Sequence, residues 1–201
     1  MTRRRRFEGQ IVGVGTTSGV RLVVGHWERS PLGSFSDVMV ERADGHRILL
    51  APSEEVAGFV ASTYTFDEVR IEPLTVDRTG RTWCVRSPSL RLEVESGDRT
   101  PLGWLLRLVP RRVATSTAWS TLTDPVARLL LRGVRTKGSA GQGRREYYGA
   151  TDAHRVTAAG GRLEGQELGS LAPVDPPCRF GFSSTPRRPQ VTEVTTTVVT
   201  S

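Results

Sequence analysis

The stretch ERSPLGSFSDVMVERADGHRILLAP, residues 28–52, decides how the fold is interpreted. It begins with the turn sequence Ser30 to Gly33, in which proline fixes φ and glycine accepts conformations that other residues avoid. Residues 35–40 then have a strand pattern, and Asp44-Gly45 gives the two-residue signal of a tight hairpin before a second strand. The stretch therefore places a short acidic side chain, Asp37, near the start of a strand and beside apolar residues.

Strand patterns dominate the rest of the chain as well. Runs rich in β-branched and alternating apolar residues occupy residues 8–15, 20–27, 66–76, 81–86, 90–95, 147–157 and 191–199. Helical spacing is confined to short segments at residues 53–62, 102–109 and 123–133. We therefore predict a mainly β fold, an antiparallel, closed or nearly closed β-barrel with two or three short helices, because closure removes exposed sheet edges.

The domain organisation follows from the same patterns. We expect a basic N-terminal tail over residues 1–7 and one β-rich domain over residues 8–201. This domain contains a helical insertion at about residues 100–133 and a glycine-rich loop over residues 135–145. The leucine and valine stripes of the insertion are expected to plug an open end of the sheet, and facing a membrane or a partner is the alternative.

The composition restricts the classes of protein that fit. The net charge is +7, and Lys137 is the one lysine among 28 basic residues, so arginine gives the surface its attraction for anions. Cys84 and Cys178 are too far apart in the sequence for a C-x-x-C site, which excludes a disulfide framework and a cysteine-rich zinc site. Since no apolar run approaches the roughly 20 residues of a membrane span, and the N-terminus lacks a signal-peptide pattern, we expect a cytoplasmic protein.

Known catalytic and cofactor motifs are absent from the sequence. The glycines of residues 13–19 precede a strand and no helix, so they do not form a dinucleotide fingerprint. His26, His46 and His154 have no spacing typical of metal ligands, and there is no G-x-S-x-G elbow. We therefore expect neither a metal nor a cofactor.

Lys137 is a candidate for nucleophilic chemistry. The neighbouring arginines, Arg135, Arg144 and Arg145, would lower the pKa of its ammonium group, and such a lysine can form a Schiff base with a carbonyl compound. The alternative is an ordinary solvated lysine in a loop.

The segment SPLGSFSDVMV, Ser30 to Val40, resembles the acetoacetate decarboxylase-like superfamily, and residues 171–183 resemble the C-terminal segment of that superfamily. The resemblance implies a cone-shaped β-barrel with an interior pocket for a small carbonyl or carboxylate compound. Gly33, Phe35 and Asp37 match the family's turn motif, with Asp37 in place of a glutamate. The family's Schiff-base lysine segment has its nearest likeness at residues 58–62, which contain no lysine.

These observations lead to one main hypothesis and two alternatives. The main hypothesis is a β-barrel that binds a small anionic organic ligand, a carboxylate or carbonyl compound, either as a binding protein or as an enzyme, and that can form a homo-oligomer. Its candidate catalytic residues are Asp37, Lys137 and Tyr148, and its candidate ligand-binding residues are Gly33, Phe35 and Arg135. The alternatives are a basic nucleic-acid-binding protein, which the scarcity of aromatic platforms disfavours, and a partner-binding protein that uses its amphipathic helices.

Overall fold

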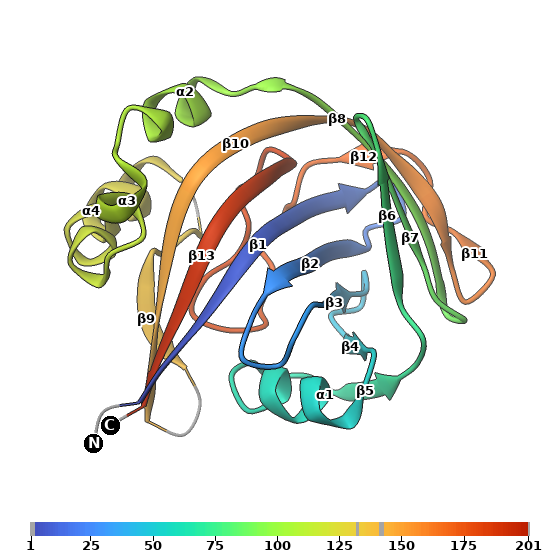
Figure 1. The fold of residues 1–201 in the computed structure, drawn as a ribbon. Helices are drawn as coiled ribbons and strands as arrows, with labels where there is room; N and C mark the ends of the chain where they lie inside the picture. The colour runs from blue at the N-terminus through green and yellow to red at the C-terminus, as the bar shows by residue number, and fades with distance from the viewer. Residues whose placement is uncertain (1–2, 132, 141–142, 201) are drawn as a thin grey trace.

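The computed structural model describes residues 3–131, 133–140 and 143–200. Within this part of the chain, one curled sheet holds ten successive strands in the spatial order β5-β4-β3-β2-β1-β13-β10-β8-β7-β6 (Figure 1). Their bounds are β1 Arg3–Thr16, β2 Arg21–Arg29, β3 Phe35–Glu41, β4 Arg47–Ala51, β5 Glu68–Ile71, β6 Thr75–Thr79, β7 Thr82–Arg86, β8 Leu90–Arg99, β10 Arg144–Leu163 and β13 Gln190–Thr200. Three short strands pair beside this path, β9 Lys137–Ala140 and β11 Gln166–Glu167 with β10, and β12 Leu171–Ala172 with β1.

The sheet is mainly antiparallel, as predicted, but it is open. The outermost strands are β5, which pairs with β4 in parallel, and β6, which pairs only with β7 among the described residues. The prediction of a closed or nearly closed barrel is therefore wrong. The physical reason is that the sheet folds over on itself, so that β7 and β8 pack face to face against the first four strands. This packing buries the core without hydrogen bonds between the two outermost strands.

Side chains alternate between two faces along the first three strands. The even-numbered residues form the main core with β7 and β8, and its fully buried members include Val12, Val14, Leu22, Val24, Val38, Val40, Trp83, Val85 and Leu92. The odd-numbered residues, among them Phe7, Val23, Trp27, Phe35 and Met39, point to the opposite face. One face thus stabilises the fold, and the other is left for a site.

Four helices are described, one more than the upper number predicted. They are α1 Glu54–Ala61, which lies below β4 and beside β5 in Figure 1, and α2 Pro101–Arg107, α3 Arg111–Ala114 and α4 Thr117–Leu130, which lie along β10 at the left of that view. Helix α4 begins six residues before the predicted start at residue 123, because the Ser116 hydroxyl accepts a hydrogen bond from the Trp119 backbone at 3.1 Å and caps it there. Pro125 consequently lies inside the helix. Among the described residues, no helix is long and apolar enough to cross a membrane.

Two predicted irregular segments are instead strands. The basic run of the predicted tail belongs to β1, whose ladder with β13 extends from Gly13 to Arg3, and the Arg6 guanidinium contacts Glu8 at 3.1 Å. Much of the predicted loop over residues 135–145 is β9 and the start of β10, with Lys137 opposite Tyr147, while residues 141–142 lie outside the description. In both cases backbone pairing with a distant strand overrides the local composition.

Candidate functional site

A cavity of about 470 Å³ lies on the odd-numbered face of the first strands. It is covered by side chains from α1, α2 and α4 and from the irregular chain before β13. Most of the lining is apolar, including Phe7, Ile11, Val23, Phe35, Met39, Phe59, Leu102, Leu106, Val126, Phe180 and Val198. A cavity of this kind favours a small molecule with a mainly apolar body.

Asp37 is a buried acidic group in this cavity. The Trp27 indole nitrogen donates a hydrogen bond to its carboxyl group at 3.0 Å. Burial raises the pKa of Asp37 to about 7, and the hydrogen bond from Trp27 opposes that rise. Gly25 makes room for this pair, since a Cβ atom at Gly25 would lie 2.5 Å from Asp37 Oδ1 and 2.7 Å from Trp27 Nε1.

A second buried carboxyl group, Glu146, is held by two tyrosines. The Tyr64 hydroxyl lies 2.9 and 3.0 Å from the two Glu146 carboxyl oxygens, and 2.6 Å from the Tyr148 hydroxyl. Glu146 and Tyr148 are two residues apart on β10, so the alternation of the strand points both into the cavity. Tyr64 comes from the chain after α1, so the cluster joins two distant parts of the fold.

Burial changes the pKa values of all three members of this cluster. Burial raises the pKa of Glu146 to about 7, against the effect of hydrogen bonds from the two tyrosine hydroxyls. Burial, and then the charge of Glu146, raises the pKa of Tyr64 and of Tyr148 well above the usual value. Asp37 lies close enough for its charge to raise the pKa of Tyr148 further. Both tyrosines therefore stay protonated, while Glu146 can gain or lose a proton.

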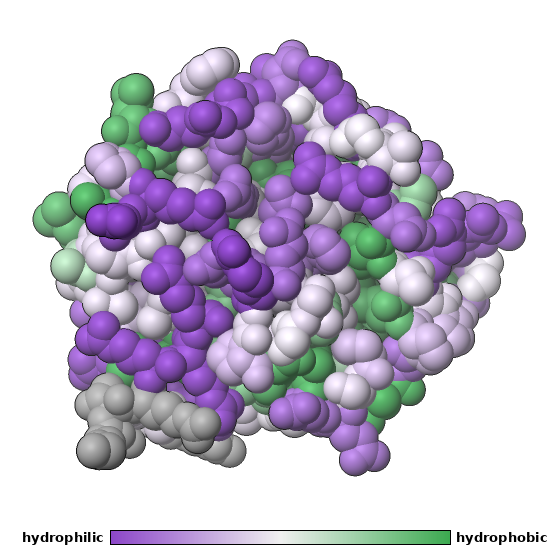
Figure 2. All heavy atoms as spheres, viewed as in Figure 1, coloured by the Kyte–Doolittle hydropathy of each residue, from purple (hydrophilic) through white to green (hydrophobic). Residues whose placement is uncertain are grey.

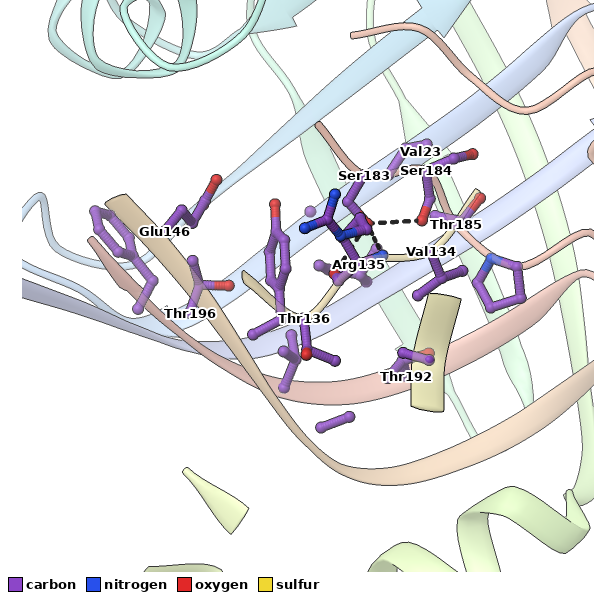
Figure 3. Close-up of a pocket in the computed structure, with 18 of the residues that line it drawn as sticks. Val23, Val134, Arg135, Thr136, Glu146, Ser183, Ser184, Thr185, Thr192 and Thr196 are labelled. Atoms are coloured by element: carbon purple, nitrogen blue, oxygen red, sulfur yellow. Dashed lines mark hydrogen bonds between the residues drawn. The ribbon is translucent and has the colours of Figure 1, made fainter. Parts of the chain in front are cut away.

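Two further polar groups line the cavity. The buried hydroxyls of Thr185 and Thr196 have no hydrogen-bond partner within the part of the chain described by the structure. In Figure 3, Thr196 lies beside Glu146, whereas Thr185 lies at the other end of the labelled group with Arg135 and Ser183. Buried hydroxyls of this kind usually have partners, so both are available to polar atoms of a bound molecule.

Four of the six residues selected from the sequence line the cavity: Asp37, Phe35, Tyr148 and Arg135. The Arg135 guanidinium is engaged by the Asp124 carboxylate, with Nη2–Oδ2 at 2.9 Å and Nε–Oδ1 at 3.1 Å. Asp124 also accepts the Thr136 backbone N–H at 2.9 Å, so this ion pair fixes α4 to the chain that enters β9. Arg135 is thus a structural ion-pair partner at the cavity wall.

Gly33 and Lys137 lie elsewhere. Gly33 adopts a φ of +81° in the turn before β3, where glycine is favoured, and it does not line the cavity. The Lys137 ammonium lies 5.9 Å from the centre of the Tyr147 ring. Because Tyr147 alternates with the cavity-facing Tyr148, Lys137 is on the face of the sheet that points away from the cavity.

Tyr64, Glu146 and Trp27 are functional candidates that sequence reasoning missed. A signal for Glu146 was present, since an acidic residue at an inward-facing position beside Tyr148 breaks the expected apolar pattern of a buried strand face. Tyr64 follows a helix end, and no sequence pattern indicates that it meets β10. Within the described ranges, no group of three or more histidine, cysteine or acidic side chains is arranged to hold a metal ion.

No family model matches the chain, and no curated protein matches it. A solved structure does. The chain is similar to acetoacetate decarboxylase from Legionella pneumophila, a crystal structure that it matches at 10% sequence identity with a TM-score of 0.42, over 98% of this chain and 87% of that chain. This is the family that the Ser30 to Val40 motif resembles.

Proposed function

We propose that the protein binds a small, mainly apolar molecule through one carbonyl or hydroxyl group of that molecule. The observation that carries the proposal is the hydrogen-bonded cluster of Tyr64, Glu146 and Tyr148 in an otherwise apolar cavity. A cluster of polar groups at a defined place in such a cavity fixes the orientation of a ligand, while the apolar wall supplies most of the affinity. Tyr148 is the member whose hydroxyl oxygen is hydrogen-bonded through Tyr64 to the buried carboxyl group.

The charges around the cavity favour a neutral ligand over the anion expected from the sequence. Asp37 and Glu146 are acidic, and a bound carboxylate would meet their like charge whenever they ionise. Arg135 is the one cationic side chain in the described lining, and it already pairs with Asp124. The proposal therefore keeps the carbonyl compound of the sequence hypothesis and replaces the carboxylate by a neutral molecule.

The proposal contains no Schiff base. Lys137 is the single lysine of the chain, and it does not line the cavity. Recognition of a carbonyl oxygen by a hydroxyl needs no covalent bond, and one hydrogen bond to a neutral group contributes about 0.5–1.5 kcal/mol.

A calorimetric titration tests the proposal. We expect methyl octyl ketone and the corresponding secondary alcohol to bind at slightly acid pH, with nonanoate binding more weakly. Tyr148→Phe removes the hydroxyl and keeps the ring, so the ketone affinity should fall by about 2- to 10-fold. Tyr147→Phe is the matched control, because the neighbouring ring lies outside the cavity and its loss of a hydroxyl should leave affinity unchanged.

Two results would contradict the proposal. One is the absence of binding by every probe to the wild-type protein. The other is equal ketone affinity of wild type, Tyr148→Phe and Tyr147→Phe, which would place the ligand away from the cluster.

Proton transfer is a second candidate function, favoured by the presence of two buried carboxyl groups with pKa values near 7 in one cavity. The Asp37 carboxylate would take a proton from the carbon next to the ketone carbonyl, and the C–H electron pair would form the C=C bond of an enol. The Tyr148 hydroxyl would donate its proton to the carbonyl oxygen. Tyr148 would then receive a proton from Tyr64, and Tyr64 would receive one from the protonated Glu146.

Deuterium exchange tests this second function. In deuterated buffer, the wild-type protein should incorporate deuterium next to the carbonyl of methyl octyl ketone, as observed by NMR. Asp37→Asn should bind the ketone and lose the exchange. Exchange at the wild-type rate in Asp37→Asn would exclude Asp37 as the base.

A further inference from the structure

We propose that α2 and α4 dock on a membrane surface that carries anionic lipids, and that the cavity receives its apolar ligand at that surface. The uptake step rests on the proposed function, whereas the docking step does not.

The helical segment exposes large apolar side chains. Leu108 and Leu129 are 79% and 85% exposed, and Trp104, Leu105, Leu122 and Val126 are also exposed. In Figure 2, hydrophobic residues gather at the edge of the molecule where Figure 1 shows α2 and α4. The predicted plugging of the sheet thus describes only part of these helices, because Leu102 and Leu106 line the cavity while Leu108 and Leu129 face outward. A group of large, exposed apolar side chains like this one is typical of an interaction site.

The charge of the segment is one-sided. Residues 101–131 contain four exposed arginines, Arg107, Arg111, Arg112 and Arg128, and one acidic residue, Asp124, which is buried against Arg135. Two of the arginines already face acidic side chains, since Arg107 lies 3.7 Å from Asp152 and Arg111 lies 3.7 Å from Glu8. Arg112 and Arg128 make no such ion pair within the described part of the chain, so they carry the excess positive charge. Exposed leucine and tryptophan next to arginine are typical of helices that lie in the interface of an anionic bilayer. Exposed arginine side chains near such a surface are attracted to its anionic headgroups.

The mouth of the cavity opens at the same surface. Leu105 of α2 and Val126 of α4 line the cavity and are exposed at the same time, 61% and 55% respectively. Leu106 and Ala127 continue the lining inward from these two helices. An apolar molecule that leaves a bilayer at this place would reach the cavity without crossing water.

The charge of the patch also favours a membrane over a second copy of the chain as its binding partner. In a two-fold symmetric dimer the patch would face itself, so Arg112 and Arg128 of one copy would approach those of the other. Like charges placed together across an interface cost binding energy, whereas anionic lipid headgroups complement them.

Vesicle sedimentation of the full chain, without any ligand, tests the docking step. The wild-type protein should sediment with phosphatidylcholine vesicles that contain phosphatidylglycerol, should stay in solution with phosphatidylcholine alone, and should dissociate as salt is raised. Arg112→Glu/Arg128→Glu and Leu108→Glu/Leu129→Glu should each reduce the bound fraction at least tenfold. Arg91→Glu, an exposed arginine at the far end of β8, is the matched charge control and should bind as wild type does.

Trp104 gives an independent readout, since its ring is exposed on α2. Brominated lipids should quench tryptophan fluorescence in the wild type and much less in Trp104→Phe. Quenching of equal size in both proteins would overturn the proposed orientation.

Other outcomes overturn the proposal as well. The first is no sedimentation with anionic vesicles at low salt, and the second is equal sedimentation with neutral vesicles. The third is a wild-type dimer in light scattering that Leu108→Glu/Leu129→Glu dissociates, because that result would assign the patch to self-association. The two proposals fail separately: ketone binding without vesicle binding removes docking alone, and vesicle binding without binding of any probe removes the proposed function alone.

Discussion

The hydroxyl oxygens of Tyr64 and Tyr148 lie 2.6 Å apart, and Tyr64 also contacts both carboxyl oxygens of Glu146. One hydroxyl proton lies between the two tyrosine oxygens, so its direction depends on Glu146. When Glu146 is ionised, it accepts from Tyr64, which accepts from Tyr148, and Tyr148 then offers only lone pairs to a ligand. When Glu146 is protonated, it can donate to Tyr64, which donates to Tyr148, and the Tyr148 proton becomes available to a carbonyl oxygen.

The first prediction concerns the pH dependence of ligand binding. Because the pKa of Glu146 is about 7, the affinity for methyl octyl ketone should fall as pH rises from about 6 to about 8. The corresponding alcohol should change less, since it can donate as well as accept. In Glu146→Gln the amide donates to Tyr64 at every pH, so the ketone should bind with little pH dependence in calorimetric titrations.

Asp37→Asn is the control for this prediction, because the pKa of Asp37 is also about 7. The variant should keep the pH dependence of ketone binding. If Asp37→Asn abolishes the dependence and Glu146→Gln preserves it, the assignment to Glu146 is wrong.

The second prediction concerns stability. The pKa of Asp37 rises from 3.8, its ordinary value, to about 7 in the folded protein. Between these two pH values, Asp37 is therefore ionised in the unfolded chain and protonated in the folded protein. The free energy of unfolding should therefore decrease with rising pH, by about 1.4 kcal/mol per pH unit from this group. Asp37→Asn should remove this part of the slope in urea unfolding at a series of pH values. An unchanged slope in the variant would show that Asp37 is not a buried protonated acid.

The third prediction concerns Gly25. In Gly25→Ala the added methyl group would lie 2.5 Å from Asp37 Oδ1, so the Trp27–Asp37 pair must move. We expect a loss of about 1–3 kcal/mol of stability and weaker ketone binding. Gly58→Ala is the matched control, because a Cβ atom there has no neighbour within 4 Å and alanine favours the exposed helix position by about 0.5–1 kcal/mol. Equal stability of the two variants would contradict the tight packing at Gly25.

The fourth prediction concerns Lys137. Its ammonium lies over the Tyr147 ring on the face that points away from the cavity, so it cannot reach a bound carbonyl group there. Borohydride treatment with a panel of keto acids should leave the protein unlabelled by mass spectrometry, and Lys137→Arg should bind methyl octyl ketone as wild type does. A reduced adduct on Lys137 would restore the Schiff-base hypothesis.

Part of the candidate site could be predicted from the sequence. The sequence indicates Asp37 because it lies near the start of a strand beside apolar residues and matches the acidic position of the family's turn motif, and Asp37 lies buried in the cavity wall. Tyr148 was selected as a weaker candidate and also faces the cavity. Tyr64 could not be selected, because its partner Glu146 is 82 positions away and local patterns carry no information about such contacts.

The sequence by itself determined the features that depend on neighbouring residues. These are the strands, from their alternation and β-branched residues, the hairpin at Asp44-Gly45, and the capped start of α1 at Ser53, whose hydroxyl accepts the Val56 N–H. Only the tertiary structure decided that the sheet stays open, that the basic run at the N-terminus is a strand, and that Tyr64, Glu146 and Tyr148 share one cavity. The physical reason is that these features depend on ladders and packing between distant segments, whose partners are fixed when the whole sheet folds.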